Sequence, residues 1–156
     1  MPIATDADAE IRRLQDLLDR MPPARALGLR IERLDAAEIQ IGAPLERNFN
    51  DKGCAFGGSL AALLTLAAWG ALEAALHRVG EDADLYIADS RLDYLAPLYE
   101  DLRATAALPD ASAIEELRTK LAARGRGGLR LRAEAHDAGG RVVARLEGRY
   151  AAVRRG

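Results

Sequence analysis

The feature that most constrains the fold of this chain is an apolar run, SLAALLTLAAWGALEAAL, at residues 59–76. The run is long enough to cross a membrane, but it is rich in alanine and glycine and contains Glu73, and no other segment resembles it. In a globular domain, a helix that is apolar on nearly every side is one that the rest of the chain surrounds. We therefore expect a helix buried in a core and no membrane association.

Most of the remaining chain alternates apolar and polar residues with the period of β-strands. Two strands are expected near residues 29–31 and 39–43, with a turn at 34–38. Four more are expected at 85–98, 102–108, 129–135 and 142–150, and the last two form a hairpin about residues 137–140. Within 85–98, strict alternation places Leu85, Ile87 and Asp89 on one face and Ser90, Leu92 and Tyr94 on the other.

Two further helices are expected outside these strands. The first follows the capping residues Thr5 and Asp6 and is stopped by Pro22 and Pro23, and a short second helix runs from Asp110 to Gly125. The order predicts an α+β fold, in which an antiparallel sheet of about six strands wraps around the central apolar helix. We expect an N-terminal helix at residues 1–22 and a single domain at 23–156, with the short helix inserted before the last two strands.

Composition limits the chemistry. Cys54 is the only cysteine, and His77 and His136 are the only histidines, so we expect no disulfide, no metal site and no cofactor. Cys54 has no neighbour in sequence that would lower its pKa, so a small buried thiol is expected. The N-terminus lacks an apolar signal core, which predicts a cytoplasmic protein.

Charge is divided unevenly along the chain. Residues 118–156 contain 11 basic and 3 acidic side chains, whereas residues 1–117 contain 11 basic and 21 acidic ones. The basic segment is either a solvated face or a patch for an anionic partner. A nucleic acid is not favoured, because the whole chain is acidic and no aromatic residues are interleaved with the arginines. The residues concerned are Lys120, Arg124, Arg126, Arg130 and Arg132.

The loop before the apolar helix, NFNDKGCAFGGS at residues 48–59, resembles the corresponding loop of hot-dog-fold thioesterases. Trp69-Gly70, Asp89-Ser90 and Tyr94-Leu95-Ala96-Pro97 extend the resemblance over about residues 22–153. The combination is most similar to a bacterial thioesterase-like domain found alone or behind an acetyltransferase domain, some members of which are implicated as malonyl-acyl-carrier-protein decarboxylases. The resemblance implies a hot-dog fold, a homodimer with its site between subunits, and a thioester substrate on acyl carrier protein (ACP) or coenzyme A. The sequence leaves open whether two dimers assemble further.

The resemblance also implies a site. An Asn or Gln at the position of Asn50 faces the thioester in such enzymes, and the first helical amides donate to its carbonyl oxygen. Gly57 and Gly58 allow a substrate to approach the backbone, where unpaired N–H groups favour developing negative charge. The alternative is that Asn50 only closes a turn and the glycines only permit tight packing. We expect substrate contacts from Phe56, Ser59, Thr65, Trp69 and Ser90, and carrier contacts from Lys120, Arg124 and Arg126.

Two positions depart from the family pattern. Phe56 stands where a histidine is usual, and Thr65 stands where a carboxylate that serves as base or nucleophile is usual. Decarboxylation of a malonyl thioester needs neither base nor water; it needs a polarised carbonyl and an apolar setting for the carboxylate. We therefore expect conversion of malonyl-ACP to acetyl-ACP. The alternatives are hydrolysis by water activated at Asp51 or Asp89, and a binding domain without catalytic activity.

Overall fold

The computed structural model describes residues 6–156 and has eleven elements. They are α1 (Asp6–Asp19), α2 (Pro22–Leu27), β1 (Arg30–Leu34), β2 (Glu38–Ala43), the 3₁₀ turn η1 (Leu45–Arg47), α3 (Gly57–Arg78), β3 (Ala83–Tyr94), β4 (Leu102–Ala107), α4 (Ala111–Arg124), β5 (Arg126–His136) and β6 (Val142–Arg154).

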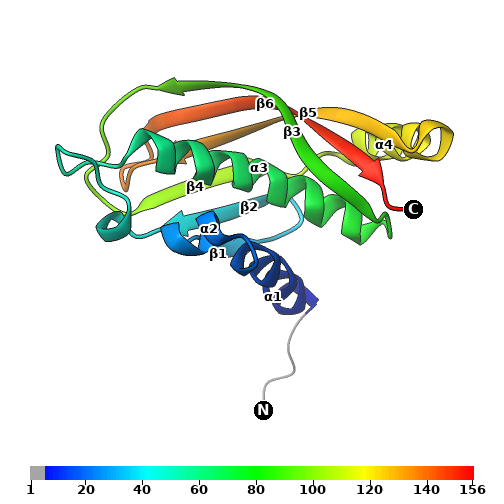
Figure 1. The fold of residues 1–156 in the computed structure, drawn as a ribbon, viewed down its shortest axis with the longest axis horizontal. Coiled ribbons are helices and arrows are strands. Elements are labelled where there is room, and N and C mark those ends of the chain that lie inside the picture. Colours follow the sequence, from blue (N-terminus) through cyan, green and yellow to red (C-terminus); the bar gives the residue numbers. More distant parts are fainter. Residues whose placement is uncertain (1–5) are drawn as a thin grey trace, which may run out of the picture.

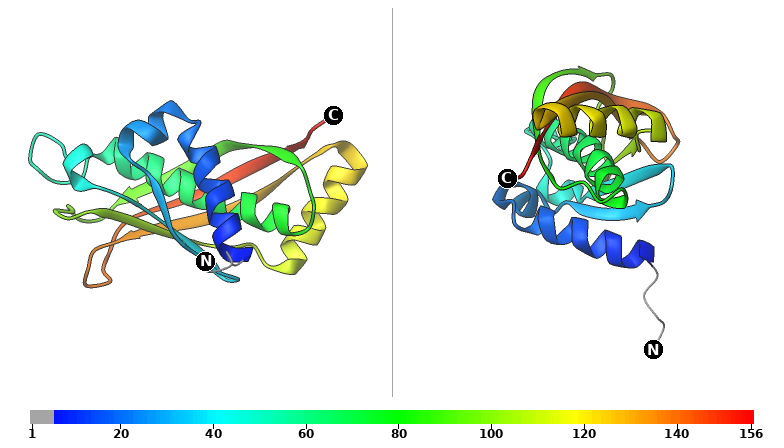
Figure 2. Two further views of the ribbon diagram at one scale, coloured as in Figure 1. Left: turned by 90° about the horizontal axis from the view of Figure 1, so that it is seen from below. Right: turned by 90° about the vertical axis from the view of Figure 1, so that its right-hand side faces the viewer.

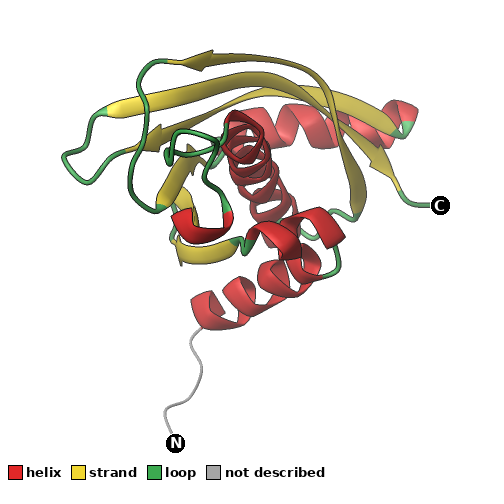
Figure 3. Ribbon diagram, turned by 60° about the vertical axis from the view of Figure 1, so that its left-hand side comes forward, coloured by secondary structure: helices red, strands yellow, loops and turns green. Residues whose placement is uncertain are grey.

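A curved antiparallel sheet partly encloses the long helix α3 (Figure 1). The strands lie in the order β1-β2-β4-β5-β6-β3, and every neighbouring pair is antiparallel. In a view nearly along α3, the sheet arches over the helix while α1 and α2 lie below it (Figure 3). The predicted fold class, an antiparallel six-stranded sheet around a central apolar helix, is confirmed.

α3 is the centre of the core, as its composition predicts. By length and composition alone it could span a membrane, yet 67% of its most apolar window is buried inside the fold. A glycine at position 70 lets the helix approach the sheet, because a Cβ there would lie only 2.9 Å from Cδ1 of Ile39 on β2. Small residues along α3 therefore allow close contact with the strands.

The N-terminal segment forms two helices where the sequence predicted one. α1 ends at Asp19, before the prolines, and Pro22 begins α2. Proline suits the first position of a helix, because the N–H that it lacks would have no partner within the helix there. The predicted capping residue Thr5 lies outside the described residues.

The two edges of the sheet differ in how they are covered. At the β1 edge, Gln15 of α1 accepts the N–H of Ile31 through Oε1 at 2.8 Å and donates through Nε2 to the carbonyl oxygen of Leu29 at 3.1 Å. This side chain therefore satisfies backbone groups that an edge strand would otherwise leave open. The other edge is β3, which has 12 residues and pairs with β6 on one side only.

β3 changes face at an irregularity that simple alternation does not predict. Its register with β6 shifts between Ile87 and Asp89, where Ile87 pairs with Tyr150 and Ser90 pairs with Gly148. Cross-strand partners share a face, and Tyr150 faces α3, so Ile87 and Ser90 both face the helix while Asp89 faces away. The prediction that grouped Leu85 and Ile87 with Asp89, opposite Ser90, is wrong because the bulge adds one residue. The strand also ends at Tyr94, four residues earlier than expected.

α4 covers one end of the sheet, next to β5 (Figure 2). Its start and end follow the predicted signals. Asp110 caps the helix by accepting the N–H of Ala113 at 2.8 Å, and Gly125 ends it in a left-handed conformation with φ of 73°. Ile114, Leu117 and Leu121 supply its buried face.

Candidate active site at the start of α3

The loop before α3 is folded back on itself as a tight hairpin. Phe49 and Ala55 form an isolated antiparallel bridge, and the N–H of Asn50 donates to the carbonyl oxygen of Cys54 at 2.8 Å. Gly53 has a φ of 81°, a conformation that glycine adopts without strain. The loop therefore holds Asn50 close to the residues that lead into α3.

The side chain of Asn50 is fixed within this loop. Its Oδ1 accepts the N–H groups of Lys52 at 2.9 Å and Cys54 at 3.3 Å, and its Nδ2 donates to Sγ of Cys54 at 3.2 Å. The amide nitrogen carries a second N–H, for which residues 6–156 provide no acceptor. Asn50 thus closes a turn and also presents one uncommitted donor from a partly exposed side chain. Its role toward a thioester stays a prediction.

Three backbone donors lie at the first turn of α3. Phe56 is the N-cap, and its side chain cannot accept a hydrogen bond. Within the described part of the chain, no acceptor is found for the N–H groups of Gly57, Gly58 and Ser59. Gly58 leaves room for the Phe56 ring, because a Cβ there would lie 2.5 Å from Cε1 of the phenyl group. The helix start is therefore open at Gly58 and partly open at Gly57, beside a Phe56 ring that is 54% exposed. Ser59, a predicted substrate contact, is instead buried, with an exposed fraction of 3%.

Asn48 is the residue that fixes this loop to the rest of the fold, and sequence reasoning did not assign it a role. Its side chain is buried, and Nδ2 donates to the carbonyl oxygens of Leu27 at 2.8 Å and Pro44 at 2.7 Å. Its own carbonyl oxygen accepts the N–H of Phe56 at 2.7 Å. Asn48 therefore connects the ends of α2 and β2 to the N-cap of α3. Its Oδ1 is buried without a partner among the described residues.

A cavity of about 300 Å³ opens beside the first turn of α3. Its floor is apolar and buried, and the ring of Tyr94 stands at its rim. The Tyr94 hydroxyl donates to the carbonyl oxygen of Gly57 at 3.1 Å, which connects the end of β3 to the start of α3. The lining residues are Ala55, Gly57, Leu60, Tyr94, Leu95, Ala96, Pro97 and Leu98.

The other predicted substrate contacts lie further along α3. Thr65 is eight residues beyond Gly57, about 12 Å along the helix axis. The buried hydroxyl of Tyr150 donates to the Thr65 carbonyl oxygen at 2.6 Å, and burial raises the pKa of this phenol, so it stays a neutral donor. Ser90 pairs with Gly148, two residues from Tyr150, and is exposed on the α3 side. Thr65 and Ser90 therefore adjoin the same stretch of β6, while Trp69 is half-buried one turn beyond Thr65.

Neither of the two predicted alternative bases is well placed in this chain. Asp51 is exposed and accepts a hydrogen bond from Nζ of Lys52 at 3.0 Å, which holds the pKa of Asp51 below its ordinary value and makes it a weaker base. Asp89 faces away from α3, and its Oδ1 lies 3.6 Å from a guanidinium nitrogen of Arg130. The one acid on α3, Glu73, is at the far end and pairs with Arg13 at 2.9 Å.

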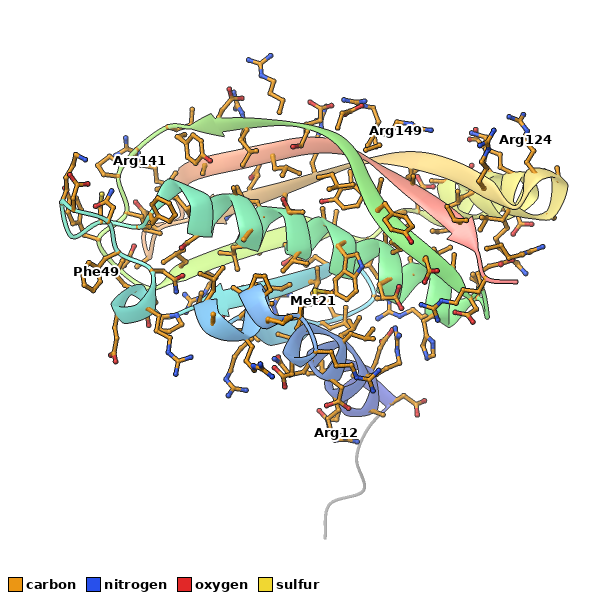
Figure 4. The ribbon with its side chains drawn as sticks, in the orientation of Figure 1. Arg12, Met21, Phe49, Arg124, Arg141 and Arg149 are labelled. Atoms are coloured by element: carbon orange, nitrogen blue, oxygen red, sulfur yellow. The ribbon has the colours of Figure 1, made fainter. Side chains whose placement is uncertain are left out.

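The predicted carrier-binding residues lie at the opposite end of the molecule. Figure 4 shows Arg124 at one end and Phe49, next to Asn50, at the other. The 22-residue helix α3, about 33 Å long, runs between these ends. Lys120 pairs with Glu116 at 3.1 Å, whereas Arg124 and Arg126 have no carboxylate partner within residues 6–156. In a single chain, this patch is therefore remote from Asn50.

The chain has an α+β hot-dog fold with polar donors at the start of its central helix, and the family match places it in the thioesterase superfamily. The chain belongs to the family described as "Putative thioesterase (yiiD_Cterm)", whose model matches residues 11–154. No curated protein compared with this chain matches it.

Solved structures show the same fold over nearly the whole chain. A protein of unknown function from Chlorobaculum tepidum is 25% identical with a TM-score of 0.89, and the match covers 97% of this chain and 98% of that one. A "putative thioesterase" from Shewanella oneidensis is 24% identical with a TM-score of 0.83, covering 94% and 99%. A "probable thioesterase" from Pseudomonas aeruginosa is 24% identical with a TM-score of 0.77, covering 92% and 95%.

Proposed function

We propose that this chain is an acyl-thioester enzyme whose favoured reaction is decarboxylation of malonyl-ACP to acetyl-ACP. The observation that carries the proposal is a group of uncommitted donors, the N–H groups of Gly57 and Gly58 and Nδ2 of Asn50, beside an apolar cavity. Phe56 and Thr65 occupy the positions at which the resembling hydrolases carry a histidine and a carboxylate. The site thus offers polarisation of a carbonyl without a base.

The reaction suits such a site because the thioester itself receives the electrons. The bond between the malonyl methylene carbon and its carboxylate breaks, carbon dioxide leaves, and the electron pair passes to the thioester oxygen as an enolate. Backbone N–H groups at a helix start and the amide of Asn50 stabilise that oxygen. A proton from solvent then adds to the enolate carbon, which gives the acetyl thioester. The cavity contributes no basic side chain that would hold the carboxylate in place.

Hydrolysis of an acyl thioester is the second candidate, and the description of the family favours it. Hydrolysis needs a base that activates water, but Asp51 is paired with Lys52 and Asp89 faces away from α3. A hydrolase would therefore need a water activated by a group of a second copy, or by Asp51 after its contact with Lys52 is broken.

The enzyme is proposed to act as a homodimer joined through β3. This edge is open, whereas Gln15 covers the β1 edge, and Ile87 remains 41% exposed although it faces α3. Antiparallel pairing of β3 with its copy would place the Ala83 end of one strand beside the Tyr94 end of the other. Because Arg126 lies near the Ala83 end through β6, the partner's basic patch would then approach the start of α3. That arrangement supports a role for Lys120, Arg124 and Arg126 in holding an acidic ACP or the phosphates of coenzyme A.

Two neighbouring variants test the proposal. Asn50→Asp keeps the oxygen that accepts the Lys52 and Cys54 N–H groups but removes the donor, so turnover of malonyl-ACP should fall by about 100-fold. Asp51→Asn should leave decarboxylation unchanged, because that carboxylate has no part in it. Steady-state rates of both variants, with circular dichroism to verify folding, provide the measurement. Full turnover by Asn50→Asp would remove Asn50 from the mechanism, and inactivity of Asp51→Asn would favour hydrolysis.

A further inference from the structure

The cavity beside the start of α3 has fixed walls. The N–H of Ala55 donates to the carbonyl oxygen of Leu98 at 2.8 Å, which joins the loop before α3 to the segment after β3. The N–H of Leu95 donates to the carbonyl oxygen of Val143 on β6, also at 2.8 Å. Both walls are thus held by backbone hydrogen bonds, as expected of a binding pocket formed before its ligand arrives.

The interior of this cavity is apolar, and its polar groups lie at one edge. Leu60 and Leu98 form a floor with exposed fractions of 4% and 1%, while Tyr94 at the rim is 55% exposed. The Tyr94 hydroxyl is engaged with the Gly57 carbonyl oxygen, so it offers the interior mainly its ring. The uncommitted N–H groups of α3 begin at Gly57, which also lines the cavity. The shape therefore suits an apolar group with a carbonyl at one end.

Tyr94 closes one side of the cavity. A Cβ built at Gly57 would lie 3.6 Å from Cε1 of the Tyr94 ring, so the ring stands in van der Waals range of the first turn of α3. The residues that follow, Leu95–Leu98, lie beyond the end of β3. Pairing of β3 with another chain would consequently not displace Leu95–Leu98, which form this side of the cavity.

We propose that this cavity, the Tyr94 pocket, binds the acyl part of the thioester and that Tyr94 limits the length of the acyl chain. The inference rests on the proposed function, because the α3 amides must hold the thioester carbonyl for the acyl group to enter the pocket. The cavity of about 300 Å³ is open to solvent, so we expect the position of the Tyr94 ring, rather than the volume, to set the limit on chain length. A malonyl group fits within this limit, and its carboxylate would meet no cationic side chain there.

The test uses binding, so that it does not depend on which reaction occurs. The probes are 2-oxoalkyl-pantetheine thioethers of increasing chain length, which keep a carbonyl but cannot be cleaved at the sulfur. With the wild-type protein, affinity should rise about fourfold for each added methylene and stop rising at the length at which the chain meets the Tyr94 ring. Tyr94→Ala should extend the rise by several carbons. Tyr94→Phe, which keeps the ring, should retain the wild-type limit.

Tyr86→Ala is the matched control, because Tyr86 is 59% exposed on the same strand but pairs with Ala151 on the opposite face. This variant should behave like the wild type. The same length limit in Tyr94→Ala and wild type would overturn the inference, as would a limit that moves equally in Tyr86→Ala. If Tyr94 limits the length of the bound chain but the protein turns over no thioester, the proposed reaction is wrong and the assignment of the pocket is retained. Absence of binding at every length would overturn the pocket.

Discussion

Asn48 and Asn50 are separated by one residue, yet their surroundings give them different roles. Asn50 is partly exposed and keeps one N–H uncommitted, whereas Asn48 is buried and uses both N–H groups to hold the ends of α2 and β2. The resemblance to thioesterases pointed to Asn50 but gave no reason to examine Asn48. The difference could not be predicted from the sequence, because it depends on which amide the fold buries.

Loss of the Asn48 side chain should destabilise the fold strongly. In Asn48→Ala, the carbonyl oxygens of Leu27 and Pro44 lose their donor, and we expect the free energy of unfolding to fall by about 2–4 kcal/mol. Urea denaturation followed by circular dichroism measures this change. Glu46→Ala, at an exposed position in the same region, should change the value by less than about 0.5 kcal/mol. Equal stability of the two variants would show that Asn48 does not hold the loop.

Among the elements, those with plain periodicity were predicted well, and those that depend on local geometry were not. Alternation predicts the hairpin of β5 and β6 to within a few residues, and the apolar run predicts α3. The bulge near Ile87 leaves no mark in the sequence, since Ala88 between Ile87 and Asp89 fits either face. α2 was missed because Pro22 was read only as the end of a helix, although proline is equally suited to begin one.

The side chain of Gln15 should protect the β1 edge from exchange with solvent. In Gln15→Ala, the N–H of Ile31 loses its acceptor, so its hydrogen exchange should become at least about tenfold faster. Exchange measured by NMR at this amide is the test. Asp16→Ala changes the adjacent, exposed residue of α1 and should leave the Ile31 rate unaltered. An unchanged rate in Gln15→Ala would mean that the edge is covered by something other than this contact.

At the scale of the whole molecule, one face and one sheet edge lack a partner within residues 6–156. Trp69 and Thr65 are only half-buried on α3, and the neighbouring β3 has no strand on its outer side. The composition is consistent with these open surfaces. Aromatic residues make up only 4% of the sequence, and a core with few large side chains is stabilised when further apolar surface is buried against a second copy. Arg124 lies at the opposite end of the molecule from Phe49, the neighbour of Asn50 (Figure 4). In the proposed dimer, antiparallel pairing of the two β3 strands would bring opposite ends of the two chains together.

A charge at position 87 should separate the proposed dimer. Ile87 and Val153 are both 41% exposed, but Ile87 faces α3 on the open edge strand and Val153 lies on the other face of the sheet. We expect Ile87→Arg to have the mass of a monomer in size-exclusion chromatography with light scattering, and Val153→Arg to remain dimeric. A wild-type monomer, or a dimeric Ile87→Arg, would contradict pairing through β3.

In the proposed reaction, donors at the start of α3 stabilise an enolate formed by loss of carbon dioxide. The most direct measurement is mass spectrometry of the carrier after incubating the protein with malonyl-ACP in deuterium oxide. We expect acetyl-ACP that carries at least one deuterium on its methyl group, because the enolate carbon takes its proton from solvent. Free malonate with the carrier thiol released would instead show hydrolysis and contradict decarboxylation at this site.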